Sequence, residues 1–124
     1  VGTALERIAA RGVAAGLVLR LHTPVATIKS HLGRLAMVTL LGTRMGIKGV
    51  GLDPQAEGRH REARHLIDAT GSQPLLAADG GIREHTVPGL RKAGADTIVM
   101  GSLAFGADNL ADRMSWVHSL PGPG

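Results

Sequence analysis

The chain of 124 residues contains no cysteine and no tyrosine, and its only aromatic side chains are Phe105 and Trp116. Without cysteine, neither disulfides nor thiolate metal sites can form. Single-stranded nucleic acids are usually bound by stacking on aromatic side chains, so the shortage of aromatics argues against such a partner despite a formal net charge of +4. No apolar run reaches the length of a membrane span, and the first residues lack a signal-peptide pattern. We therefore expect a cytoplasmic protein with no membrane or nucleic-acid partner.

The residues that are abundant indicate an α/β protein. Hydrophobic residues make up 44% of the chain and are almost all aliphatic, which suits buried parallel strands and the helices that cover them. Eighteen glycines suit a fold with many turns between strands and helices. The length fits one domain, residues 1–124. The first residue is Val1 rather than Met, which indicates either a processed start or a part of a longer protein.

Apolar periodicity and turn signals predict one helix followed by four strand–helix units. In the first helix, Thr3 and Glu6 fit a capping box. In the last one, Asn109 is the N-cap, and Leu110, Met114 and Val117 form a buried stripe. Such alternation predicts a parallel sheet, either a small open α/β sheet or half of a (β/α)8 barrel. The expected helices are 3–11, 23–35, 53–69 with an interruption near 58, 86–92 and 109–118, and the expected strands are 14–21, 35–41, 74–78 and 97–100.

Glycine turns follow the last two predicted strands, at Gly80-Gly81 and at Gly101-Ser102. Glycine lets backbone amides approach an anion, and turns after neighbouring strands bind phosphate in many (β/α)8 barrels. We predict that these four residues bind a substrate phosphate, with the Ser102 hydroxyl assisting. Asp79 lies at the end of the third strand, where a carboxylate suits proton transfer or metal binding. The alternatives are two ordinary turns, and an Asp that caps its own turn.

The histidines give weaker signals. His60, Glu62 and His65 fall on one predicted helix among several arginines, and we interpret them as a solvated basic surface rather than a metal site. His22 follows the first predicted strand, where it is either a turn residue or a binding residue.

A glycine-rich segment, residues 42–51, is interpreted as a mobile loop over the strand ends. It carries Arg44 and Lys48, which either close over a phosphorylated substrate or keep the loop soluble. Asp53 after this loop is interpreted as a helix N-cap.

Three segments together resemble the C-terminal half of ribulose-phosphate 3-epimerases. They are AADGGI at 77–82, AGADTIVMGSLAF at 93–105 and GLVLRLHTP at 16–24. The resemblance covers most of the chain in order. The Asp-Gly-Gly piece alone occurs in other phosphate-binding barrels, whereas the combination is more specific.

The resemblance implies half of a (β/α)8 barrel of the ribulose-phosphate-binding type and an isomerase activity. The family interconverts ribulose 5-phosphate and xylulose 5-phosphate by moving a proton at C3 between two Asp residues. A divalent metal of the Zn, Mn, Fe or Co type, held by two His and both Asp, stabilises the enediolate. Asp79 matches the second Asp, so it would be catalytic and a metal ligand. Gly80, Gly81, Gly101 and Ser102 match the phosphate-binding turns.

The sequence also departs from the family. The other Asp, both His ligands and a Ser belong to the family's first four strands, which this chain does not contain. Residues 40–49 replace a loop that resembles Pro-Gly-Phe-Gly-Gly-Gln in the family, which leaves open an epimerase for another sugar phosphate. Two further functions stay open. One is a phosphate-binding half-barrel without catalysis, and the other is a lyase, although neither Lys48 nor Lys92 lies at a strand end where a Schiff base would form.

Half of a barrel leaves two strand edges unpaired and one face of the sheet uncovered. Such surfaces associate or aggregate unless they are covered. We therefore expect either self-association or a partner that supplies the N-terminal half-barrel.

Overall fold

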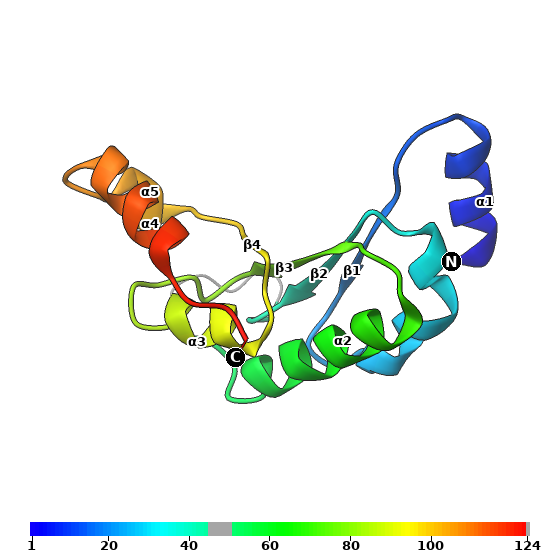
Figure 1. The fold of residues 1–124 in the computed structure, drawn as a ribbon, viewed down its shortest axis with the longest axis horizontal. Coiled ribbons are helices and arrows are strands. Elements are labelled where there is room, and N and C mark those ends of the chain that lie inside the picture. Colours follow the sequence, from blue (N-terminus) through cyan, green and yellow to red (C-terminus); the bar gives the residue numbers. More distant parts are fainter. Residues whose placement is uncertain (45–50, 124) are drawn as a thin grey trace.

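The computed structural model describes residues 1–44 and 51–123, and its centre is a four-stranded parallel sheet (Figure 1). The strands are β1 (Gly16–Leu19), β2 (Met37–Leu41), β3 (Leu75–Asp79) and β4 (Thr97–Ile98), and their order in the sheet is their order in the chain. All three pairings are parallel. The carboxyl ends of the strands therefore lie along one edge of the sheet.

Helices connect the strands and cover one face of the sheet. Helix α2, the 3-10 helix η1 and helix α3 lie on the same side of it, whereas α1 stands beyond one end of the sheet and α4 and α5 stand beyond the other (Figure 1). Aliphatic side chains from both layers form the larger core cluster, including Leu40 and Leu76 from the sheet and Ile28 and Ile67 from the helices. The helices are α1 (Gly2–Ala10), η1 (Val25–Arg34), α2 (Ala56–Thr70), α3 (Val87–Ala93), α4 (Ser102–Phe105) and α5 (Leu110–Ser119).

No helix within the described residues covers the other face of the sheet (Figure 1). Side chains alternate between the two faces of a strand, so the neighbours of core residues point away from the helices. Val18 is 59% exposed, Leu75 47% and Val99 49%, although all three are aliphatic residues in or beside strands. An aliphatic sheet face in contact with solvent is what a half-barrel has at the position of a complete barrel's interior. The prediction of four parallel strand–helix units forming a half-barrel is confirmed.

Several local predictions were wrong. Helix α1 begins at Gly2 with Val1 as its N-cap, and no side chain caps it, so the capping box at Thr3 does not form. Gly58 does not interrupt α2, because packing of this long helix against η1, α3 and the sheet outweighs the weak helix propensity of one glycine. The helix after Pro24 is 3-10 rather than α.

The C-terminal elements also differ from the prediction. Strand β4 has two residues instead of four, and the short helix α4 was not predicted. Asn109 does cap α5, since its Oδ1 accepts a hydrogen bond from the Asp112 amide at 3.1 Å. The buried stripe on α5 is wrong at Leu110, which is exposed. Met114 and Val117 are half-buried, because α5 packs on little besides α4.

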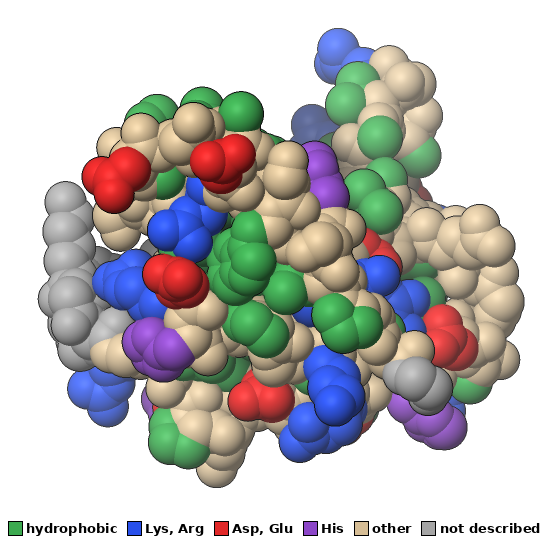
Figure 2. All heavy atoms as spheres, turned by 60° about the vertical axis from the view of Figure 1, so that its left-hand side comes forward, with side chains coloured by type: hydrophobic (Ala, Val, Ile, Leu, Met, Phe, Trp, Pro, Cys, Tyr) green, Lys and Arg blue, Asp and Glu red, His purple; other side chains and the backbone are tan. Residues whose placement is uncertain are grey.

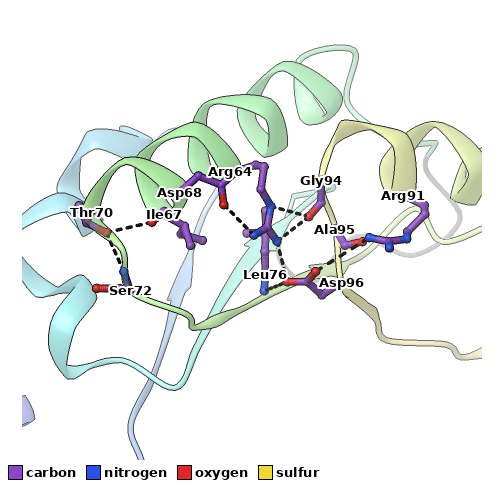
Figure 3. Close-up of polar contacts among 10 residues, drawn as sticks. All are labelled: Arg64, Ile67, Asp68, Thr70, Ser72, Leu76, Arg91, Gly94, Ala95 and Asp96. Carbon is purple, nitrogen blue, oxygen red and sulfur yellow. Dashed lines mark hydrogen bonds and ion pairs between the residues drawn. The ribbon is translucent and has the colours of Figure 1, made fainter. Parts of the chain in front are cut away.

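A polar network centred on Arg64 ties α2 to the turn between α3 and β4 (Figure 3). The Arg64 guanidinium donates to the Gly94 carbonyl from Nε at 3.2 Å and from Nη2 at 2.8 Å, and Nη2 lies 2.6 Å from Asp96 Oδ2. The same Asp96 oxygen accepts the Leu76 amide of β3 at 3.0 Å. Asp96 thus joins the helix layer to the strand that ends at Asp79.

Within residues 1–44 and 51–123, no helix is both long enough and apolar enough to cross a membrane.

Candidate functional site

Asp79 is the last residue of β3 and lies at the carboxyl edge of the sheet. Alternation along β3 puts Leu75, Ala77 and Asp79 on the uncovered face, since Leu76 and Ala78 belong to the cores under the helices. The Asp79 side chain is half-buried, and its backbone carbonyl accepts the Gly42 amide at 2.7 Å. This hydrogen bond continues the pairing of β2 and β3 and fixes the backbone on which the carboxylate stands.

The Asp79 carboxylate makes no hydrogen bond or ion pair with any described residue. It therefore does not cap the following turn, which was the structural alternative. Asp53 shows the contrast, because its Oδ1 accepts the Gln55 amide at 2.8 Å at the start of α2. That bond belongs to an Asx turn before the helix, whose N-cap is Gln55, so the prediction that Asp53 is the N-cap is wrong by two residues.

Gly80 and Gly81 have positive φ angles of 89° and 70°, a conformation that other residues rarely adopt. They are also closely packed. A Cβ on Gly80 would lie 2.6 Å from Thr43 Oγ1, and one on Gly81 would lie 2.9 Å from Leu52 Cα. Glycine is therefore required here for backbone geometry and for the approach of the chain after β2, which is a reason that the sequence analysis did not foresee.

The second glycine turn is open. Gly101 and Ser102 are exposed, and a Cβ on Gly101 would meet nothing within 4 Å. Gly101 is the N-cap of α4, and this helix starts at Ser102. The backbone amides of Gly80, Gly81, Gly101 and Ser102 donate no hydrogen bond to an acceptor among the described residues. Within the described part of the chain, all four amides therefore lack an acceptor, which is what a phosphate-binding turn needs.

A complete metal site is not found in the part of the chain that the structure describes. No three His, Asp or Glu side chains there group closely enough to hold a metal ion. Asp79 alone offers one carboxylate, whereas a catalytic metal usually takes three or more protein ligands. The described residues by themselves therefore do not fit the metal that the family resemblance implies.

His60 contradicts the prediction of a solvated basic surface on α2. Its side chain is 1% exposed, and its Nδ1 has no hydrogen-bond partner among the described residues. Burial, together with the charges of Arg59 and Arg64, lowers the pKa of His60 from 6.5 to about 4. His60 is thus a neutral core residue, because α2 turns this position toward the core while His65 stays exposed.

A basic cluster at the ends of β1 and β2 was only partly foreseen. His22 and Arg44 line two adjoining cavities of about 320 and 340 Å³, and Arg20 lines the second one with them. Thr43 also lines both cavities. Arg20 was not predicted to belong to this cluster, although alternation along 16–20 could have assigned it to the same face as Val18. Lys48 lies outside the described residues, as does most of the predicted loop.

Comparisons with known proteins agree on one family. The model of the ribulose-phosphate 3 epimerase family matches residues 1–105. Ribulose-phosphate 3-epimerase 2 of Cupriavidus necator is 38% identical over 100 residues, which cover 77% of this chain and 42% of that protein. The ribulose-phosphate 3-epimerase of Bacillus subtilis is 31% identical over 119 residues, which cover 95% of this chain and 54% of that protein. The chain spans about half the length of the curated relatives that it matches.

The fold comparison supports the same architecture. A crystal structure of 3-hexulose-6-phosphate synthase superimposes with a TM-score of 0.60 at 19% sequence identity. The match covers 94% of this chain and 54% of that one. At this identity the likeness concerns the fold alone.

Proposed function

Since this chain belongs to the ribulose-phosphate 3-epimerase family, we propose that it is the C-terminal half-barrel of an isomerase that epimerises a ketose phosphate at C3. In this proposal, residues 1–124 form one domain that works in the cytoplasm. The observation that carries the proposal is the position of Asp79. Its carboxylate has no partner among the described residues, lies on the face opposite the helices, and is followed directly by the Gly80–Gly81 turn.

The proposed role of Asp79 is to move a proton at C3 from one face of the sugar. A carboxylate acts as a base only if no other group holds its oxygens, and Asp79 meets this condition within the described residues. Epimerisation also needs a second acid on the opposite face of C3, because the proton must return from the other side. The family resemblance puts that acid in a part of the barrel that this chain does not contain.

The proposed phosphate site consists of the amides of Gly80, Gly81, Gly101 and Ser102. Turns after neighbouring parallel strands face the same edge of the sheet, so the amides of both turns reach one anion. The positive charge of the chain supports binding of a phosphorylated sugar. Holding the phosphate on the β4 side of Asp79 would leave the sugar carbons to extend along the strand ends.

The family resemblance also implies a divalent metal of the Zn, Mn, Fe or Co type, with Asp79 as one ligand. Its chemistry when bound is stabilisation of the negative oxygen that forms when C3 loses its proton. The described residues do not complete that site. The remaining ligands in this proposal therefore come from another half-barrel.

That other half-barrel is either a second copy of this chain or a partner that supplies the N-terminal half. The uncovered sheet face exposes Val18, Leu75 and Val99, and Phe105 on α4 is 90% exposed. Figure 2 turns the α4–α5 end of the molecule forward and shows hydrophobic side chains in the middle of that end, with charged ones around them. Apolar patches of this kind indicate protein contacts. Light scattering distinguishes the two, because a monodisperse monomer of 12.8 kDa would exclude a second copy and leave the separate partner.

The activity is tested by exchange of the C3 proton of ribulose 5-phosphate with deuterium from solvent, followed by NMR with the full chain and added Zn²⁺ or Mn²⁺. We expect exchange by the unmodified chain only when another half-barrel supplies the second acid and the remaining metal ligands, and we expect Asp79→Asn to abolish it with phosphate binding retained. Phosphate binding without exchange in the unmodified chain would instead support a phosphate-binding module that does no chemistry. Absence of both would refute the proposed function.

A further inference from the structure

Arg20 lies in the same row of the sheet as Asp79. Leu19 pairs with Leu40 of β2, so the next residue, Arg20, lies opposite Leu41. Leu41 in turn pairs with Asp79 of β3. Neighbouring strands are about 4.8 Å apart, so the backbones of Arg20 and Asp79 are separated by roughly 10 Å across β2. Across the sheet, the Arg20 guanidinium group thus belongs to a residue two strands away from the proposed catalytic Asp79.

Alternation assigns the Arg20 side chain to the uncovered face. Val18 is exposed on that face, and Leu19 is buried in the core under the helices. Arg20 is two residues after Val18, so its side chain lies on the same face of the sheet, and it is exposed. Its backbone is held by the helix layer, because the Arg20 carbonyl accepts a hydrogen bond from Arg59 Nη2 of α2 at 2.9 Å.

Two more basic side chains surround Arg20. Arg44 and His22 line the same cavity of about 340 Å³, together with Leu21, Leu41 and Thr43, and no acidic side chain lines it. Asp53 reaches only the adjoining cavity, and one of its oxygens already accepts the Gln55 amide. None of the ion pairs among the described residues involves Arg20, His22 or Arg44. A cavity lined by two arginines without an ion-pair partner among the described residues, and by no carboxylate, is suited to an anion.

Asp79 therefore stands between two places that suit negative charge. The Gly101 turn follows β4 on one side of Asp79, and the cavity around Arg20 lies toward β1 on the other side. The Gly80–Gly81 turn comes directly after Asp79 and packs against the chain after β2. We propose that Arg20, assisted by Arg44, binds a second anionic group of the substrate, either a second phosphate or a carboxylate. The substrate would then be a sugar phosphate with an anion at each end and the reacting carbon between them. This inference rests on the proposed function and narrows its substrate class.

Isothermal titration of the full chain tests the inference with three probes at roughly 0.15 M salt, where nonspecific attraction is screened. Ribulose 5-phosphate has one anionic group, ribulose 1,5-bisphosphate has a second phosphate, and 6-phosphogluconate has a carboxylate. We expect at least one of the last two to bind about tenfold more tightly than ribulose 5-phosphate, since a charge-assisted contact is added. The probe that is preferred identifies the second anion as phosphate or carboxylate.

The variant Arg20→Gln should abolish the preference and leave the affinity for ribulose 5-phosphate within about twofold. Arg11→Gln, at the exposed C-terminus of α1, is the matched control and should keep the preference. Equal binding of all three probes, or a preference that survives in Arg20→Gln, would overturn this inference and leave the proposed function standing. Failure to bind any probe would overturn both. Circular dichroism of Arg20→Gln verifies that a loss of preference is not a loss of fold.

Discussion

Replacing Arg64 by alanine should destabilise the protein by about 2–3 kcal/mol, because one side chain holds three parts of the fold together. Its guanidinium makes two hydrogen bonds to the Gly94 carbonyl and a 2.6 Å ion pair with Asp96. The side chains of Arg64 and Asp96 are only 21% and 31% exposed, so water replaces these partners incompletely. Each hydrogen bond to a charged group is worth roughly 1.5–3 kcal/mol, and the three are not additive, which gives the range stated.

Urea unfolding followed by circular dichroism measures this loss, and thermal unfolding should show a midpoint about 10 °C lower. The matched control is Arg61→Ala, which makes the same change on an exposed position of α2 and should alter the free energy of unfolding by less than about 0.5 kcal/mol. Asp96→Asn can still accept the Leu76 amide and should cost about 1 kcal/mol, the charged part of the pair. Equal stability of Arg64→Ala and Arg61→Ala would refute the structural role given to the network.

Two further predictions concern the core and the first glycine turn. The free energy of unfolding should fall as pH decreases from about 6.5 to about 4, because the unfolded chain takes up a proton on His60 that the folded chain binds only near its lowered pKa. In His60→Leu this part of the pH dependence should be missing when urea unfolding is compared at several pH values, and identical curves would contradict it. Gly81→Ala should lower the free energy of unfolding by at least about 1 kcal/mol, since φ is 70° and the new Cβ would lie 2.9 Å from Leu52 Cα. Gly33→Ala is the control and should be nearly neutral in the same urea unfolding experiment, because its new Cβ would meet no atom within 4 Å.

The sequence was sufficient to predict the order of strands and helices and their parallel arrangement. Periodic apolar residues and glycine stops are local signals, and they located the end of β3 within one residue of Asp79. The lengths of elements at the sheet edges were less predictable. Strand β4 has a partner on one side only, and two of its four predicted residues, Thr97 and Ile98, are paired.

The position of Asp79 at the end of β3 was predictable from residue type and turn signals, whereas its role and those of the glycine turns stay predictions. The candidate site was not predictable where long-range packing decides. His60 is surrounded by charged residues in sequence, yet tertiary contacts of α2 bury it. The proposed role of Arg20 depends on the pairing register of β1, β2 and β3, because nothing near Arg20 in the sequence relates it to Asp79. The tight packing of Gly80 against Thr43 likewise depends on two segments that are far apart in the chain.

The order of the strands has a consequence for how a chain of this kind can be lengthened. Among the described residues, every strand pairs only with the strands next to it in the chain, so no other strand lies between two consecutive ones. A strand–helix unit added next to β1 or next to β4 would extend the sheet without changing the order of the existing strands. Duplication or fusion of whole strand–helix units therefore keeps the same topology and requires only that the new strand can pair with an edge strand of the sheet.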